Sequence, residues 1–211
     1  MRILAIDTAL GLCSAAVVDG GRVLATRSEA MLQGHQERLA PLVSEVVAES
    51  KVTFKHIDRI GVTVGPGSFT GLRVGLSFAK GLGFARDVPV VGLDSLEAIA
   101  ASAPREGAGL ALIDARRGQA YVRRFEGDHP VGPSEAVTLE ALMSGAAPDW
   151  IAGPGVGLVS DIWQTAIVDG RAACDPVALA RLAAQADPDS HPPIPVYLRA
   201  PDAKLPGGID P

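Results

Sequence analysis

Two aspartates stand where apolar strands are expected to end, and both could hold a metal ion beside a phosphate. Asp7 follows the apolar run of residues 3–6, and Asp114 follows a similar run at a constant offset of 107 positions. Carboxylate oxygens are the ligands that Mg²⁺ prefers. An aspartate at a strand end can instead accept hydrogen bonds from the amides that follow it, in an Asx turn. Neither residue has a partner base or a further carboxylate nearby in the sequence, and both interpretations stay open.

Two glycine-rich loops could bind an anion through their backbone amides. Residues 65–68 lead from an apolar strand into a helical pattern, and residues 153–157 form the second loop. The first loop lacks the Lys-Ser/Thr pair of a phosphate-binding loop, and its third glycine is one residue late for a dinucleotide fingerprint. A tight strand-to-helix turn is the other interpretation. The candidate cofactor contacts are therefore Asp7, Gly67, Asp114 and Gly155.

Other catalytic patterns are missing from the sequence. The four histidines are His35, His56, His129 and His191. None stands four residues from another, so no helical zinc pair is present. No G-x-S-x-G nucleophile motif occurs, and the two cysteines match neither a disulfide framework nor a metal knuckle. The residues therefore predict no catalytic group, no metal site and no cofactor held by a recognised motif.

The elements that position these residues follow from hydrophobic periodicity. Strands are expected at 3–6, 12–18, 22–28, 60–64 and 88–93, and helices at 36–50, 71–85 and 94–101. The helix at 36–50 has a conventional apolar stripe, whereas the helix at 71–85 is apolar around most of its circumference. The small residues of this second helix follow one another at intervals of four: Gly71, Gly75, Ala79 and Gly83. Such a ridge permits close backbone approach, and we expect the protein's own sheet on one side and a second helix, in this chain or a partner, on the other.

Composition indicates a globular protein of one large or two small domains. The chain has 211 residues, of which 47% are hydrophobic, and a net charge of −5. Independent binding to nucleic acid is unexpected, because the net charge is negative and the basic residues are scattered along the chain. The cysteine pattern suits a reducing compartment, so cytoplasm is the expected location. No window approaches the 18 or more apolar residues of a membrane span, and no signal layout opens the chain.

An internal repeat predicts two lobes. The segments that begin at Leu4 and Ala111 both read as strand, acidic turn, strand, and the second begins just after a linker at 101–107. We expect an amino-terminal lobe at 1–100, a carboxy-terminal lobe at 101–199 and a loose tail at 200–211. Paired turns of this kind match an α/β, two-lobed actin-like or ribonuclease-H-like (ASKHA) fold, with a mixed sheet flanked by helices in each lobe.

Six motifs together resemble the TsaB (YeaZ) family, the dimerisation subunits of the bacterial machinery that makes tRNA threonylcarbamoyladenosine. They are ILAIDTA, HQERLAP, GVTVGPGSFTGLRVGLSFAKGL, GLDSLEAIA, LIDARRGQAYV and PVYLRAP. The resemblance implies the actin-like fold and a non-catalytic subunit that heterodimerises with the catalytic TsaD, with the ATPase TsaE as a third member and tRNA contacted only through the complex. It also implies the loss of TsaD's metal-binding H-x-x-x-H, because Leu39 stands four residues after His35.

In that family the two amino-lobe helices pack against those of TsaD as a four-helix bundle, which implies an interface on helices 36–50 and 71–85. The expected interface residues are Leu39, Leu42, Val43, Val46, Gly71, Leu72, Gly75, Leu76, Ala79 and Gly83. Without TsaD, the exposed face could form a homodimer. An ATP-dependent phosphotransferase on the same fold is the alternative function, and it requires the two glycine loops to hold phosphates. The sequence contains neither the metal ligands nor the nucleophile that a peptidase would need.

Overall fold

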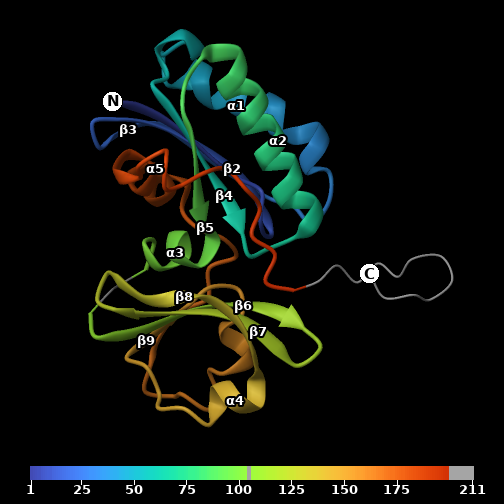
Figure 1. The fold of residues 1–211 in the computed structure, drawn as a ribbon, viewed down its shortest axis with the longest axis vertical. Coiled ribbons are helices and arrows are strands. Elements are labelled where there is room, and N and C mark those ends of the chain that lie inside the picture. The colour runs from blue at the N-terminus through green and yellow to red at the C-terminus, as the bar shows by residue number, and fades with distance from the viewer. Residues whose placement is uncertain (104–105, 200–211) are drawn as a thin grey trace, which may run out of the picture.

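The computed structural model describes residues 1–103 and 106–199, and the tail expected at 200–211 lies outside these residues. Within the described ranges, ten strands form two mixed five-stranded sheets, one above the other in Figure 1. The strands are β1 (Arg2–Asp7), β2 (Leu12–Asp19), β3 (Arg22–Ala30), β4 (Arg59–Gly65), β5 (Val90–Asp94), β6 (Ala108–Arg116), β7 (Gln119–Glu126), β8 (His129–Thr138), β9 (Trp150–Ala152) and β10 (Ile167–Asp169). The helices are α1 (His35–Glu49), α2 (Phe69–Arg86), α3 (Ser95–Ala100), α4 (Leu139–Met143) and α5 (Pro176–Gln185).

The first sheet has the order β3-β2-β1-β4-β5. Strand β1 pairs antiparallel with β2 and parallel with β4. The β2–β3 hairpin turns at Gly20 and Gly21, whose φ angles of 55° and 86° are left-handed, a conformation that glycine adopts without steric cost. Successive side chains of β1 point to opposite faces of the sheet. Leu4 and Ile6 therefore pack toward α1 and α2, and Ile3 packs toward α3 and α5.

The second sheet repeats this topology, with the order β8-β7-β6-β9-β10. Strand β6 pairs antiparallel with β7 and parallel with β9, as β1 does with β2 and β4. The internal repeat expected from the sequence is therefore present in the pairing of the strands. Asp7 closes β1, and Asp114 lies near the end of β6.

Helices cover both faces of the first sheet. The helices α1 and α2 lie side by side on one face, and α5 lies on the other (Figure 1). Arg59 of β4 holds α5 at its carboxyl end, because its Nη1 donates to the carbonyl oxygens of Ala183 at 2.8 Å and Ala186 at 2.7 Å. A positive charge at this end of a helix is favourable. The chain therefore returns to the first sheet within the range 101–199 that was expected to form a second lobe.

The two sheets are joined through α3. Asp94 caps this helix by accepting hydrogen bonds from the amides of Leu96 and Glu97. Arg123 of β7 lies 2.9 Å from Glu97 and 3.6 Å from Asp94, so charged groups of the second sheet are fixed to the start of α3. Among the described residues, no helix combines the length and apolar character needed to span a membrane.

Candidate functional site

Asp7 is buried at the end of β1, with 1% of its surface exposed. Its Oδ1 accepts hydrogen bonds from Thr63 Oγ1 at 2.7 Å and from the amide of Ala9 at 2.9 Å, and Cys174 Sγ donates to Oδ2 at 3.4 Å. Burial raises the pKa of the Asp7 carboxyl above its ordinary value, and these hydrogen bonds and the nearby His35 oppose the rise. The carboxylate therefore joins β1, β4 and the segment that leads into α5.

Cys174, the thiol beside this carboxylate, is itself buried. Burial, followed by the proximity of Asp7, raises the pKa of the Cys174 thiol well above its ordinary value. A thiol with a raised pKa is rarely present as the reactive thiolate. Cys174 therefore serves as a buried hydrogen-bond donor to Asp7.

Asp114, at the equivalent position of the second sheet, makes the same type of turn closer to the surface. Its Oδ1 accepts a hydrogen bond from the amide of Arg116 at 2.7 Å, and its Oδ2 pairs with Arg116 Nη1 at 3.1 Å. Arg116 and Arg117 have left-handed φ angles of 64° and 55°. Both aspartates thus accept from the amide two residues on, which is an Asx turn. Within the described parts of the chain, no group of three or more His, Cys, Asp or Glu residues could hold a metal ion.

The two glycine loops pack against neighbouring strand ends. The amide of Ser68 donates to the carbonyl oxygen of Ala9 at 2.7 Å, and a Cβ added to Gly67 would lie 2.5 Å from that oxygen. In the second loop, the amide of Gly155 donates to the carbonyl oxygen of Leu112 at 3.1 Å. Some of the amides that would bind a phosphate are therefore used within the fold. Both loops have the form of tight connections.

The glycine ridge of α2 faces the protein's own sheet. A Cβ added to Gly71 would lie 2.1 Å from the carbonyl oxygen of Thr8, and one added to Gly75 would lie 2.6 Å from Thr8 Oγ1. At the far end of the helix, a Cβ on Gly83 would lie 2.3 Å from a methyl group of Val90. Thr8 also donates a hydrogen bond to the carbonyl oxygen of Gly71 at 2.7 Å. The close approach expected with another molecule is thus made within the lobe.

This placement corrects the assignment, made from the family resemblance, of ten residues of the two helices to a partner interface. All ten are buried in the interior of the first lobe: Leu39, Leu42, Val43, Val46, Gly71, Leu72, Gly75, Leu76, Ala79 and Gly83. They are the stripes that attach α1 and α2 to the sheet, because the most apolar and smallest face of each helix packs where burial is most complete. Two of the ten also line surface pockets: Leu39 lines a groove beside the start of α2, and Gly83 lines a shallow pocket at the other end of this helix.

The outer face of α2 is also apolar. Phe69 is 41% exposed and Phe84 is 92% exposed, and Val74, Phe78 and Leu82 are partly buried. A groove of about 470 Å³ runs between α1 and α2 on this side. This outer groove is lined by Gln36, Leu39, Phe69, Thr70, Arg73, Val74, Ser77 and Phe78. One sequence pattern pointed to the outer groove. The helix α2 is apolar around most of its circumference, which predicted that a second side of it is covered.

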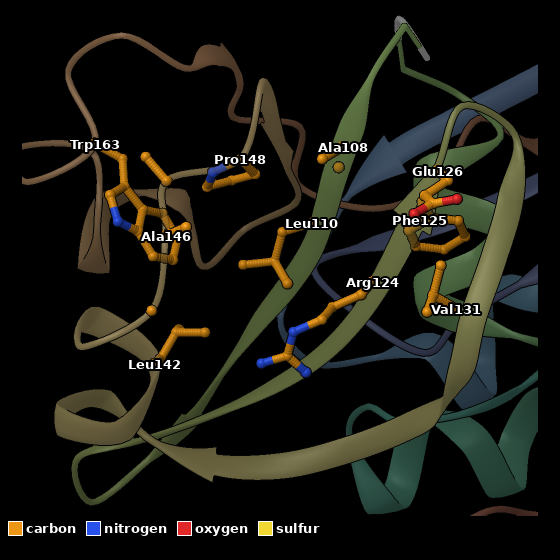
Figure 2. A pocket seen from close by; sticks show the side chains of 13 residues that line it. Ala108, Leu110, Arg124, Phe125, Glu126, Val131, Leu142, Ala146, Pro148 and Trp163 are labelled. Atoms are coloured by element: carbon orange, nitrogen blue, oxygen red, sulfur yellow. The ribbon is translucent and has the colours of Figure 1, made fainter.

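A second cavity, of about 340 Å³, lies in the second lobe. Figure 2 shows Arg124 of β7 pointing into it between Leu110 and Leu142, with Trp163 on the opposite wall. Arg124 forms an ion pair with Glu135 of the neighbouring strand. The described residues that line it include the charged Arg124 and Glu126 among apolar side chains, but no histidine, cysteine or serine. No pattern in the sequence indicated this cavity.

Two mixed sheets of the same topology, each carrying an Asx turn at the end of its central strand, define a two-lobed protein of the actin-like class, and the predicted fold class is confirmed. The solved structure titled YeaZ from Pseudomonas aeruginosa matches with a TM-score of 0.79 and 27% identity, covering 93% of this chain and 99% of that one. A family model described as TsaD, tRNA N6-adenosine threonylcarbamoyltransferase, matches residues 27–139.

Relatives in sequence agree with the structural match. The chain is 37% identical over 131 residues to the tRNA threonylcarbamoyladenosine biosynthesis protein TsaB of Escherichia coli, a match that covers 61% of this chain and 56% of that protein. The chain thus spans about half the length of the first curated relatives that it matches. An uncharacterized protein of Mycobacterium bovis is 34% identical over 210 residues, covering 96% of this chain and 93% of that protein. The chain belongs to the TsaB (YeaZ) family, within the larger group that the TsaD model describes.

Proposed function

We propose that this protein is a non-catalytic subunit that supports tRNA threonylcarbamoyladenosine biosynthesis by forming a heterodimer with TsaD. Relatives at 37% and 33% identity carry the name of a biosynthesis protein for this modification. The observation that carries the proposal is the outer groove, in which Phe69, Val74 and Phe78 of α2 are left partly uncovered beside α1. Exposed apolar patches of this kind mark protein interaction sites.

The proposed interface is the outer face of α1 and α2. Two helices of 15 and 18 residues can supply the roughly 800 Å² per partner that a stable interface needs. The buried stripes expected from the sequence support this face from beneath by fixing both helices on the sheet. In the absence of TsaD, the same apolar face would pair with a second copy of the chain.

The location of the subunit, its other partner and its contact with tRNA follow from pairing with TsaD. The subunit works in the cytoplasm beside TsaD and the ATPase TsaE, and it reaches tRNA only through the complex. The net charge of −5 supports the indirect contact, because a protein that binds tRNA alone needs a concentration of basic groups. The subunit carries no cofactor and no catalytic group in this proposal. The internal hydrogen bonds of Asp7 support that assignment.

The interface is tested with apolar-to-glutamate variants. Val74→Glu and Phe78→Glu place a charge in the outer groove, and we expect each to weaken TsaD binding at least about 100-fold, because burying an unpaired carboxylate is costly. The control is Val23→Glu on β3, where a 41% exposed apolar residue lies outside the groove. Size-exclusion chromatography with purified TsaD provides the readout. Co-elution of both groove variants would rule out this face.

The function is tested in cells. Deleting the gene for this subunit is expected to remove threonylcarbamoyladenosine from tRNA, as measured by nucleoside analysis, and the Val23→Glu variant is expected to restore it. Normal levels of the modification after deletion would refute the proposal. The alternative, an ATP-dependent phosphotransferase, predicts micromolar binding of ATP with Mg²⁺ by calorimetry. The use of Asp7 and of the loop amides within the fold argues against that alternative.

A further inference from the structure

The segment that follows α5 runs back along the first sheet and reaches the start of α2 (Figure 1). We call residues 191–199 the C-terminal strap. The carbonyl oxygen of His191 accepts from the amide of Gly92 at 2.9 Å, and the amide of Val196 donates to the carbonyl oxygen of Val64 at 2.8 Å. A Cβ on Gly65 would lie 2.5 Å from the carbonyl oxygen of Val196. The strap is thus held closely against the middle of β5 and the end of β4.

The strap places an aromatic ring at one end of the outer groove. The rings of Tyr197 and Phe69 lie 5.2 Å apart between centroids, and the guanidinium of Arg73 lies 3.6 Å from the centroid of Phe69. Arg73 Nε also donates to the hydroxyl of Tyr197 at 3.2 Å. Both rings remain about 40% exposed. Two aromatic rings and a cation are therefore arranged on the surface before any partner binds.

Charge indicates what this arrangement would bind. The charged residues of α2 are Arg73, Lys80 and Arg86, all basic, in a chain whose net charge is −5. Among the described residues, Arg73 has no ion-pair partner, and only its Nε donates a hydrogen bond. The terminal nitrogens of a guanidinium form a fork that matches a carboxylate. The adjoining groove is apolar at Leu39, Val74 and Phe78.

We propose that Phe69, Arg73 and Tyr197 form an anchoring cluster that receives an apolar helix of the partner at a point where that helix carries an aspartate or glutamate. This inference rests on the proposed function, since the partner is TsaD. The carboxylate pairs with Arg73, and the apolar side chains beside it enter the outer groove. Binding energy at interfaces concentrates in tyrosine and arginine residues that are held in place before binding. The C-terminal strap is therefore part of the docking surface.

Affinity measurements with purified TsaD test the cluster. We expect Arg73→Ala and Tyr197→Ala each to raise the Kd at least about tenfold and Arg73→Glu at least about 100-fold. The double variant Arg73→Ala with Tyr197→Ala should lose less than the product of the single effects, because each residue positions the other. Tyr197→Phe keeps the ring contact and should stay within about threefold. The matched control is Arg22→Ala on the edge strand β3.

The salt dependence of binding provides a second measurement. Raising ionic strength should weaken wild-type binding more than binding of Arg73→Ala, because the variant lacks the charge pair. If wild-type protein binds TsaD and Phe78→Glu abolishes binding, but Arg73→Ala and Tyr197→Ala stay within about threefold, the cluster is not an anchor. If these two variants separate a homodimer and leave the TsaD affinity unchanged, the occupant is a second copy and the inference is wrong. Failure of wild-type protein to bind TsaD would overturn the proposed function as well.

Discussion

Glycine occurs on both faces of α2, but close packing requires it only on the inner face. On the inner face, Gly71 and Gly75 lie so close to Thr8 that a single added carbon would overlap it. On the outer face, Gly81 has open space where a side chain would begin, and Phe84 is 92% exposed. A row of small residues therefore indicates that something approaches the helix closely, without indicating which neighbour does so. Here the neighbour is the protein's own sheet, and the proposed docking surface is the aromatic and basic face on the opposite side of α2.

The two repeated aspartates differ in a similar way. Asp7 and Asp114 make the same turn at equivalent places in the two sheets, but Asp7 is also covered by Thr63 and Cys174. The first sheet has helices on both faces, and the segment entering α5 passes over the end of β1. The same Asx turn is therefore buried in the first sheet and close to the surface in the second. Burial, and not residue type, sets what each carboxylate contributes.

The largest expected effect comes from filling the inner face. Gly71→Leu would place a side chain against the backbone of Thr8, and overpacking at such a site is expected to cost more than about 4 kcal/mol of unfolding free energy. We expect loss of soluble protein or of the cooperative thermal transition, measured by circular dichroism. The matched variant Gly81→Leu adds the same side chain to the outer face and should remain folded. A folded Gly71→Leu protein would show that the inner contact is loose.

Removing the buried carboxylate should have the next largest effect. Asp7→Ala leaves the hydroxyl of Thr63 and the amide of Ala9 without their acceptor, which is expected to cost about 2 to 3 kcal/mol in urea unfolding. The control is Asp114→Ala, nearer the surface, which should change the unfolding free energy by about 0.5 kcal/mol or less. Equal losses for the two variants would show that burial does not distinguish the two aspartates.

The pH dependence of stability tests the state of Asp7. Because burial raises its pKa in the folded protein, folding takes up a proton between the unfolded and folded pKa values. The contribution of Asp7 is therefore fully present below about pH 4, near the unfolded pKa, and is lost as pH rises through the folded pKa. Asparagine does not titrate, so the Asp7→Asn variant does not lose this stability as pH rises. The wild-type unfolding free energy should fall relative to that of the variant as pH rises from 4, and a constant difference would contradict the raised pKa.

The sequence predicted the parts of this fold that local pattern determines. The β2–β3 hairpin, the α1 stripe and the repeat that aligns Asp7 with Asp114 all depend on periodicity or turn chemistry, and all are present. The sequence did not predict how segments that are far apart in the chain pack together. No pattern in residues 176–185 says that α5 covers the first sheet, because an amphipathic helix fits either sheet equally well. The contact of Tyr197 with Phe69 joins residues that are far apart in the chain for the same reason.

The smallest expected effect is a gain in stability on the outer face. Gly81→Ala replaces a poor helix former with the best one at a position where the added carbon meets nothing, so the unfolding free energy should rise by about 0.5 to 1 kcal/mol. Thermal melting at low protein concentration measures this gain in the monomer. Gly81 lies outside the outer groove, so TsaD affinity should change by less than about threefold. A loss of stability instead would mean that the outer face is already covered in the free protein, as in a homodimer, and the contrast between the two faces of α2 would no longer hold.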